Sequence, residues 1–431
     1  MKEVLKEVLD VVKPKPEEKK LIKDLSEKVI DEINSRLRRK GIEAHVFIGG
    51  SLAKDTIVKN KIFDADIFLR FNKKYSEDDI RKLFKKIFFL FRIKGERIKL
   101  KKLHGSRDYV RVLFKNHSEF EVEVIPVSEI NNPNDARNVT DLSYFHVKYI
   151  RSKLSKRKKL ADDIVLAKAF CYANKCYGAE SYIKGFSGYA LELLIIHFKG
   201  FENFLKELGN QQDRLIIDQE KKYKSTSEIL EKMNKSRLDS PIVLVDPTFK
   251  ERNASVSLSY STFDIFKIKA KEFLENPSTS FFQEKKLDIN YLQKKAYEHD
   301  GIFLKIELKT NKQAGDIAGT KLLKFYNLLN RDIVDYFDIL GRAFEYHERI
   351  NTSYIYYAVK RKKERIIEGP KLEFKEAVEN FKKKRPVWHI KGNKIYSAKP
   401  TDITPKDFIN EFTNIHKRTI REMGITKIKI V

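Results

Sequence analysis

Two pairs of carboxylates in this sequence have the spacing expected of a divalent metal site. Asp64 and Asp66 lie at the start of one alternating apolar run, and Glu121 and Glu123 lie within a second. Alternate side chains of a β-strand point to the same face, so each pair projects together. If the two strands are neighbours, three or four carboxylates converge, and a bound cation relieves their repulsion. Oxygen ligands with water in the remaining positions suit Mg²⁺.

A glycine-rich turn precedes the first acidic pair. Gly49 and Gly50 lack Cβ atoms, so they let backbone N–H groups approach phosphates. Ser51 and the start of a short helix add a further anion site, and Lys54 can neutralise charge there. Two Mg²⁺ ions about 3.5–4 Å apart can activate an attacking hydroxyl and stabilise a leaving phosphate. Together the turn and the acidic strands predict metal-assisted nucleotidyl transfer.

The elements that position these residues predict a mixed α/β domain at residues 1–150. Two helices separated by Pro14 and Pro16 end at Gly41, and Ser76 caps a later helix whose first turn is acidic. Strands are expected at residues 43–48, 64–71, 109–114 and 119–127, the last two as a hairpin.

The remaining chain predicts two further domains, so the fold class is α+β and multidomain. Residues 151–262 are mostly helical. Residues 263–431 alternate strands, such as 303–308 and 354–359, with a long helix predicted at 318–347. A length of 431 residues fits several domains.

The composition favours a polyanionic partner. Lys and Arg total 88 against 61 Asp and Glu, a formal net charge of +27. Neutralised phosphates release counterions, and the field of the protein speeds encounter. The alternative, a lysine-rich habit of the source genome, accounts for part of the excess.

Targeting and redox signals predict a cytoplasmic protein. The N-terminus alternates charged and apolar residues and does not resemble a secretory signal. The longest apolar runs fall far short of the roughly 18 residues that a membrane span needs. The two cysteines, Cys171 and Cys176, suit neither a zinc site nor a structural disulfide and are interpreted as small apolar residues.

The order of Gly-Gly-Ser turn, Asp-x-Asp strand and later acidic strand resembles the nucleotidyltransferase superfamily related to DNA polymerase β. Two segments make the chain similar to the archaeal-type (class I) CCA-adding tRNA nucleotidyltransferases. They are residues 168–194, with Lys168 and Tyr177, and residues 246–259, with Arg252. The resemblance implies a catalytic head at 1–150, a helical neck at 151–262, and an α+β body and tail at 263–431.

The resemblance also implies roles for individual residues. Asp64, Asp66 and Glu123 would be the catalytic ligands of two Mg²⁺ ions, although the family usually has Asp at the position of Glu123. Glu121 competes with Glu123 for the third position. Eight residues are implied in nucleotide binding: Gly50, Ser51, Lys54, Ser143, His146, Lys168, Tyr177 and Arg252. Among them Ser143 replaces a threonine, and Arg252 would help to distinguish the incoming base.

The function implied is template-independent addition or repair of the 3′-terminal CCA of tRNA from CTP and ATP. An RNA 3′-hydroxyl would attack the nucleotide α-phosphate and release pyrophosphate. The expected partners are tRNA, CTP and ATP, with a homodimer as a possible assembly and no membrane. Two alternatives remain open: a poly(A)- or oligo(U)-type polymerase, and a catalytically inactive RNA-binding protein of the same fold.

Overall fold

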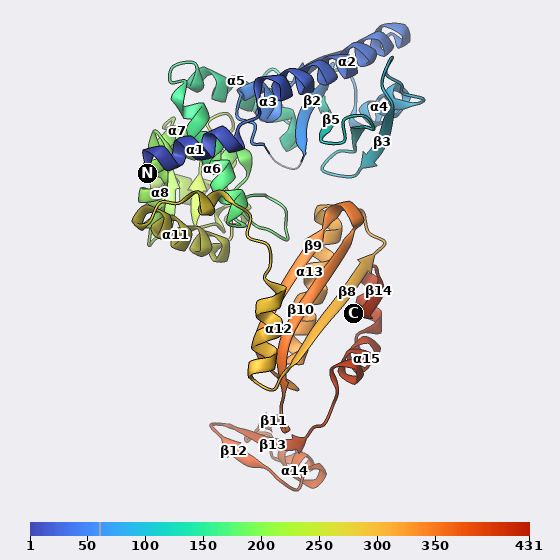
Figure 1. The fold of residues 1–431 in the computed structure, drawn as a ribbon, viewed down its shortest axis with the longest axis vertical. Coiled ribbons are helices and arrows are strands. Elements are labelled where there is room, and N and C mark those ends of the chain that lie inside the picture. Colours follow the sequence, from blue (N-terminus) through green and yellow to red (C-terminus); the bar gives the residue numbers. More distant parts are fainter. Residues whose placement is uncertain (60–61) are drawn as a thin grey trace. The chain divides into compact units, whose positions relative to one another are not determined.

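The structure, a computed structural model, describes residues 1–59 and 62–431. It contains two compact units, Met1–Lys285 and Lys286–Val431. Figure 1 shows their helices and strands. The expected fold class, α+β with a mixed sheet in the first part of the chain, is confirmed. Among the described residues, no helix is both long enough and apolar enough to cross a membrane.

The first unit begins with α1 (Lys2–Val12), α2 (Pro16–Lys40), β1 (Ala44–Ile48), α3 (Gly50–Lys54), β2 (Phe63–Phe71), α4 (Glu77–Phe88), β3 (Ile98–Leu103), β4 (Tyr109–Phe114) and β5 (Phe120–Ser128). It continues with α5 (Ser143–Leu154), α6 (Lys159–Ala173), α7 (Gly188–Phe198), α8 (Phe201–Gly209), β6 (Leu215–Ile217), α9 (Thr226–Lys232), α10 (Lys235–Leu238), β7 (Ile242–Leu244) and α11 (Tyr260–Glu275). The second unit contains α12 (Ile289–Glu298), β8 (Ile302–Thr310), α13 (Asp316–Ile333), β9 (Phe337–His347), β10 (Thr352–Arg361), β11 (Glu364–Lys371), α14 (Lys375–Lys384), β12 (His389–Lys391), β13 (Lys394–Pro400), α15 (Pro405–Ile415), α16 (Lys417–Glu422) and β14 (Ile425–Ile430).

A five-stranded sheet of order β1-β2-β5-β4-β3 carries the acidic residues. The pair β2–β5 is parallel and its other pairs are antiparallel. Helices α2 and α4 pack against one face, where Ala65, Ile67 and Leu69 are completely buried (Figure 1). The alternation of the strand therefore turns Asp64 and Asp66 to the opposite face.

Local capping fixes the helices on the covered face. Gly41 ends α2 in the left-handed conformation, as expected from its place after a basic last turn. The hydroxyl of Ser76 accepts a hydrogen bond from the Asp79 amide, and the Asp79 carboxylate accepts one from the Ser76 amide. Asp79 is thus a capping residue, as its position predicts.

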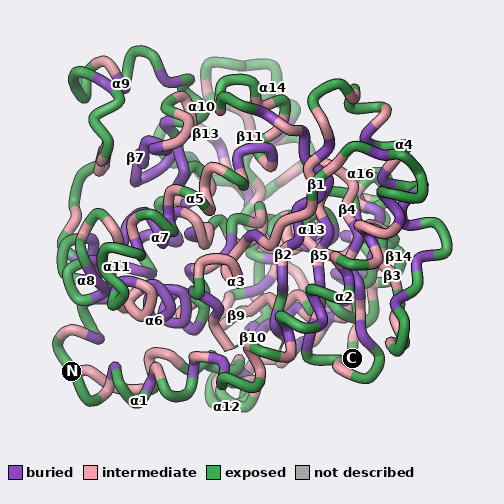
Figure 2. The backbone as a smooth tube through the Cα atoms, turned by 90° about the horizontal axis from the view of Figure 1, so that it is seen from above, coloured by how far each residue is buried: buried purple, intermediate pink, exposed green. Residues whose placement is uncertain are grey.

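Helices α5, α6, α7, α8 and α11 share a core with α1. The aromatic rings of Phe170, Phe201 and Phe273 pack together in that core, and Figure 2 shows α6 and α7 largely buried. Cys171 and Cys176 are buried free thiols, consistent with their interpretation as apolar residues.

The boundaries of this helical core differ from the expected ones. Helix α1, expected in the catalytic head, packs on α6, and α11, which crosses the expected boundary after residue 262, packs on α8.

One helix prediction in the second unit is wrong. The helix expected at 318–347 ends at Ile333, and Phe337–His347 forms β9, which pairs with β10. Short apolar runs fit both helical and strand periods, and pairing with a distant strand decides between them. The second unit holds a four-stranded sheet of order β14-β8-β10-β9 and a three-stranded sheet of order β11-β13-β12.

Candidate active site

Four carboxylates meet on the face of the first sheet that lies opposite α2 and α4. The parallel register of β2 and β5 sets Asp64 opposite Glu121 and Asp66 opposite Glu123. The neighbouring strand β4 adds one cation, Arg111, opposite Glu123. The sheet therefore brings together all four acidic residues singled out from the sequence.

Arg111 forms ion pairs with both glutamates. Its Nε and Nη2 donate to Glu123 Oε1 at 2.9 and 2.7 Å, and its Nε lies 3.3 Å from Glu121 Oε2. Within residues 1–59 and 62–431, no three His, Cys, Asp or Glu side chains are arranged so that they could hold a metal ion.

The pKa values of the two aspartates are raised, although nearby cations oppose the shift, namely Arg111 for Asp64 and Lys54 and Lys168 for Asp66. Desolvation of the carboxyl, followed by the charges of Glu123 and Glu121, raises the pKa of Asp64 to about 7, although the residue as a whole is exposed. Burial and then Glu123 raise the pKa of Asp66 to about 6. Glu123 is the strongest charged neighbour of both aspartates, which favours Glu123 over Glu121 as the third acidic member.

This donor set fits Mg²⁺. Mg²⁺ is usually held by one or two carboxylates, waters and substrate phosphates rather than by an all-protein cage. Asp64 and Asp66 supply two adjacent carboxylates whose charge is poorly compensated, as the raised pKa values indicate.

The two glycines of the turn have different roles. The Gly49 N–H donates to the Asp66 carbonyl at 2.8 Å, which joins the start of the turn to β2. Gly50 has φ of +55°, and a Cβ atom there would lie 1.7 Å from Asp66 Oδ2. Gly50 therefore lets α3 begin directly against the aspartate.

A cavity of about 130 Å³ lies beside the carboxylates. Its lining includes Ser51 and Asp64 from the sheet domain and Lys168 and Tyr177 from the helical part. The first two residues are more than 100 positions from the last two in the sequence, and the fold of the first unit makes them neighbours.

Lys54 and Lys168 meet at a carboxylate that the sequence analysis left without a role. Lys54 Nζ lies 2.6 Å from Glu192 Oε2, and Lys168 Nζ lies 2.9 Å from Glu192 Oε1. All three side chains are buried. Both lysines predicted to bind phosphate are therefore tied to α7.

A second cluster surrounds Asp246, whose side chain is completely buried. Its oxygens pair with His146 Nε2 at 3.0 Å and Arg252 Nη1 at 2.7 Å, and they accept from the Tyr189 hydroxyl at 3.1 Å. The ring of His146 stacks on Tyr189. Despite burial, the hydrogen bond from His146 and the charge of Arg252 hold the pKa of Asp246 well below its usual value. Burial lowers the pKa of His146.

The cluster borders a hollow of about 370 Å³ that Arg252 lines together with Asn138 and Leu142. Ser143 is the first residue of α5, one turn before His146. The structure thus brings His146 and Arg252 together through Asp246 and sets Ser143 on the same helix as His146.

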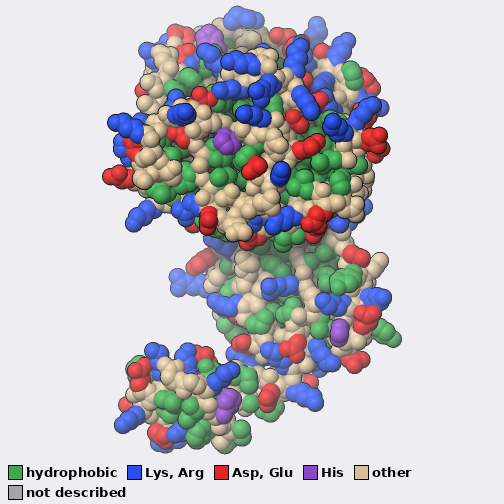
Figure 3. Space-filling view, turned by 90° about the vertical axis from the view of Figure 1, so that its left-hand side faces the viewer, with side chains coloured by type: hydrophobic (Ala, Val, Ile, Leu, Met, Phe, Trp, Pro, Cys, Tyr) green, Lys and Arg blue, Asp and Glu red, His purple; other side chains and the backbone are tan. Residues whose placement is uncertain are grey.

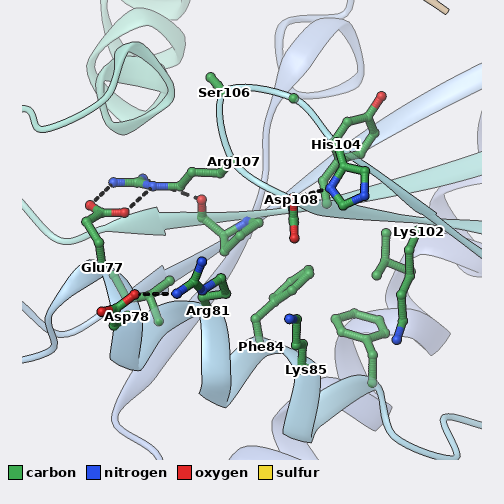
Figure 4. Close-up of a pocket in the computed structure, with 16 residues that line it drawn as sticks. Glu77, Asp78, Arg81, Phe84, Lys85, Lys102, His104, Ser106, Arg107 and Asp108 are labelled. Atoms are coloured by element: carbon green, nitrogen blue, oxygen red, sulfur yellow. Dashed lines mark hydrogen bonds and ion pairs between the residues drawn. The ribbon is translucent and has the colours of Figure 1, made fainter. Parts of the chain in front are cut away.

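A separate hollow of about 510 Å³ lies between α4 and the turn from β3 to β4 (Figure 4). None of the predicted site residues lines it. On its rim, Arg107 pairs with Glu77 and with the buried Asp141. Asp141 also accepts hydrogen bonds from the amides of Ser128 and Asn138, so this pair anchors the segment that leads into α5.

The sequence analysis missed the roles of Arg111, Glu192 and Asp246. Arg111 had a usable signal, since it lies at an alternate position of a strand predicted to form a hairpin with the acidic strand. Glu192 and Asp246 lie in the two segments that carry the family resemblance, residues 168–194 and 246–259. Sequence spacing could not reveal their roles, because their partners are distant in sequence.

Comparisons with known proteins agree with the geometry. Residues 162–283 match the family model described as "tRNA nucleotidyltransferase, second domain". The chain is 33% identical over 316 residues to the CCA-adding enzyme of Nanoarchaeum equitans, covering 73% of each chain. It is 30% identical over 443 residues to the CCA-adding enzyme of Methanocaldococcus jannaschii, covering 99% of this chain and 93% of that protein.

A solved structure of Cid1, whose title names RNA terminal uridylyl transferase activity, has a similar fold. The TM-score is 0.50 at 14% identity, over 66% of this chain and 98% of that chain. At this identity the likeness concerns the fold alone.

Gly50→Ala tests the close contact between the turn and β2. The added Cβ atom would meet Asp66 and also require the left-handed conformation, so we expect nucleotide incorporation to fall by about 100-fold or more, the loss that a displacement of about 1 Å can cause. Gly41→Ala is the matched control, because Gly41 has φ of +60° but nothing within 4 Å of its Cβ position. It should lower stability by about 1–2 kcal/mol and leave incorporation unchanged. Equal losses of activity in both variants would contradict the account.

The raised pKa values predict a pH-dependent stability in magnesium-free buffer. Between about pH 4 and pH 7 the folded protein holds more protons on these aspartates than the unfolded chain does, so their contribution to the free energy of unfolding falls as pH rises. Asp66→Asn removes one titrating group. Thermal melts should show the variant gaining stability relative to the wild type from pH 4.5 to 7.5, with saturating Mg²⁺ reducing the difference. Parallel curves over that range would rule out this electrostatic strain.

Proposed function

Because this chain belongs to the family of archaeal-type CCA-adding enzymes, we propose that it adds or repairs the 3′-terminal CCA of tRNA, using CTP and ATP without a template. One observation carries this proposal: in the parallel pair of β2 and β5, Asp64 lies opposite Glu121 and Asp66 lies opposite Glu123. Asp64 also lines the cavity together with Ser51, Lys168 and Tyr177. The proposed location of this activity is the cytoplasm.

Asp64 and Asp66 are the proposed ligands of a two-ion Mg²⁺ site, with Glu123 as the third acidic residue. Mg²⁺ bound there would acidify the attacking 3′-hydroxyl and neutralise charge on the leaving pyrophosphate. Arg111 holds Glu123 in the absence of a ligand, so recruiting Glu123 would require it to exchange that partner. The raised pKa values of Asp64 and Asp66 support metal binding at these two residues, whether Glu121 or Glu123 is the third ligand.

The nucleotide's triphosphate is proposed to lie in the cavity beside Asp64. Ser51 can donate a hydroxyl hydrogen bond, and Lys168 brings a positive charge. The phenol of Tyr177 stays protonated, because burial raises its pKa, and so remains a donor. Gly50 and Lys54 are the other proposed members of the triphosphate site. Gly50 begins α3, and Lys54 forms a salt bridge with Glu192. Catalysis would then depend chiefly on positioning and fixed charges.

Arg252, His146 and Ser143 are proposed to contact the nucleoside. Asp246 binds Arg252 through Nη1 only, and a guanidinium has further N–H donors that can meet a base edge. Because its pKa is lowered by burial, His146 favours the neutral form, which can accept as well as donate a hydrogen bond. Both groups are fixed before a ligand binds.

tRNA is the proposed acceptor, recognised by its backbone and shape. The net charge of +27 supports a polyanionic partner, and Figure 3 shows many Lys and Arg side chains on one face of the first unit. The second unit, with its two sheets, is the proposed body and tail that bind the RNA. A-form helices expose little sequence in their accessible groove, so contacts to phosphates and 2′-hydroxyls suit this role.

An incorporation assay tests the proposal. A tRNA lacking its last three nucleotides should gain two residues with CTP alone and all three with CTP and ATP together. Asp66→Ala should abolish incorporation while leaving tRNA binding, measured by gel shift, within about threefold of the wild type, because the phosphate contacts are elsewhere.

Two results would contradict the proposal. Unlimited tailing with a single nucleotide would indicate a poly(A)- or oligo(U)-type polymerase. Wild-type protein that binds tRNA but incorporates nothing with Mg²⁺ present would indicate an inactive RNA-binding protein.

A further inference from the structure

Glu192 is a buried charge at the junction of the sheet domain and the helical core. Its side chain is 1% exposed, and its two carboxylate oxygens accept hydrogen bonds from different residues. Oε2 receives Lys54, while Oε1 receives Lys168 and the hydroxyl of Thr56 at 3.1 Å. One carboxylate on α7 thus connects the end of α3 and the residues after it to α6.

The lysines are fixed in direction by these contacts. Lys168 Nζ donates to the Thr56 carbonyl at 3.2 Å and lies 3.0 Å from the Thr56 hydroxyl and 2.9 Å from Glu192. These contacts restrain the ammonium group, and contact with a phosphate requires one of its three N–H donors to leave Thr56. Lys168 also lines the cavity that holds Ser51 and Asp64. It is therefore aimed at the cavity before a ligand enters.

The electrostatics require a counterion at this point. Two buried ammonium groups next to one another repel, and burial together with Lys54 lowers the pKa of Lys168. Although burial opposes its ionisation, the charges of Lys168 and Lys54 lower the pKa of Glu192 to about 2. Glu192 is thus ionised at neutral pH and compensates one of the two positive charges, which leaves one for an incoming anion.

We propose that Glu192 is a positioning residue for the nucleotide's triphosphate, because its carboxylate holds Lys54 and Lys168 in place for contact with the β- and γ-phosphates. This inference rests on the proposed function. It assigns to α7 a part in nucleotide binding that does not involve contact between Glu192 and the nucleotide itself. It also explains why a carboxylate stands next to a site built to receive phosphate.

Two substitutions separate the charge of Glu192 from its size. Glu192→Gln keeps the shape and removes the charge, whereas Glu192→Asp keeps the charge and shortens the side chain. We expect Glu192→Gln to raise the Kd and KM for CTP and ATP by at least about tenfold, with a smaller change in kcat, because phosphate binding is lost in the ground and transition states alike. Glu192→Asp should show the smaller increase. A role in packing alone predicts the reverse order, since the isosteric variant would then be the milder one.

Two controls define the specificity of the effect. Asp162→Asn neutralises another carboxylate on the boundary of α6, where it pairs with Lys13 at 2.6 Å, and it should leave the Kd for CTP unchanged. CMP, which lacks the β- and γ-phosphates, should bind wild type and Glu192→Gln equally well. A loss of CMP binding as large as that of CTP, or an equal effect of Asp162→Asn, would overturn the inference.

A second comparison covers the case in which Glu192→Gln alone does not fold, since it leaves two buried cations uncompensated. It adds Glu192→Gln to a variant that carries both Lys54→Gln and Lys168→Gln. If Glu192 acts through the lysines, the triple variant should bind CTP no more than about threefold more weakly than the variant with the two lysine substitutions. A further loss of about tenfold or more would overturn the inference.

Direct binding of CTP, measured by calorimetry, also separates this inference from the proposed function. Failure of the proposed function would appear as wild-type protein that adds no nucleotides to tRNA. Failure of the inference would appear as an unchanged Kd for CTP in Glu192→Gln.

Discussion

The parallel pairing of β2 with β5 is the constraint on which the site depends. In this register the aspartates of one strand face the glutamates of the other, and four like charges share one surface of the sheet. Close packing of α2 and α4 on the opposite surface fixes this arrangement, because a shift by one residue would bury the carboxylates. Neighbouring cations offset part of this negative charge. Arg111 acts on Asp64, and Lys54 and Lys168 act on Asp66.

Buried carboxylates orient cations at both ends of the proposed nucleotide site. Glu192 holds Lys54 and Lys168, and Asp246 holds Arg252 together with His146. In each case a buried carboxylate fixes a cation that lines a cavity, which is Lys168 in the first and Arg252 in the second. Such pairs are weak evidence for stability, because desolvation offsets much of the attraction, but they limit the directions that long side chains can adopt. The site is therefore formed jointly by the sheet domain and the helical core.

Periodicity and capping predicted much of this architecture from the sequence. Alternation in β2 separated Ala65, Ile67 and Leu69 from the aspartates correctly, and Ser76 began a helix as expected. The failures share one cause, which is pairing between distant segments. Residues 337–347 form a strand because β10 lies beside them. Arg111, Glu192 and Asp246 likewise acquire their partners only in the folded chain.

The central claim is that Asp64 and Asp66 form a divalent metal site beside the triphosphate. Anomalous scattering from crystals grown with Mn²⁺ and CTP tests it most directly. The account predicts an anomalous peak within coordination distance, about 2.0–2.3 Å, of carboxylate oxygens of both aspartates. Well-ordered CTP in the cavity with no anomalous peak at either aspartate would contradict it.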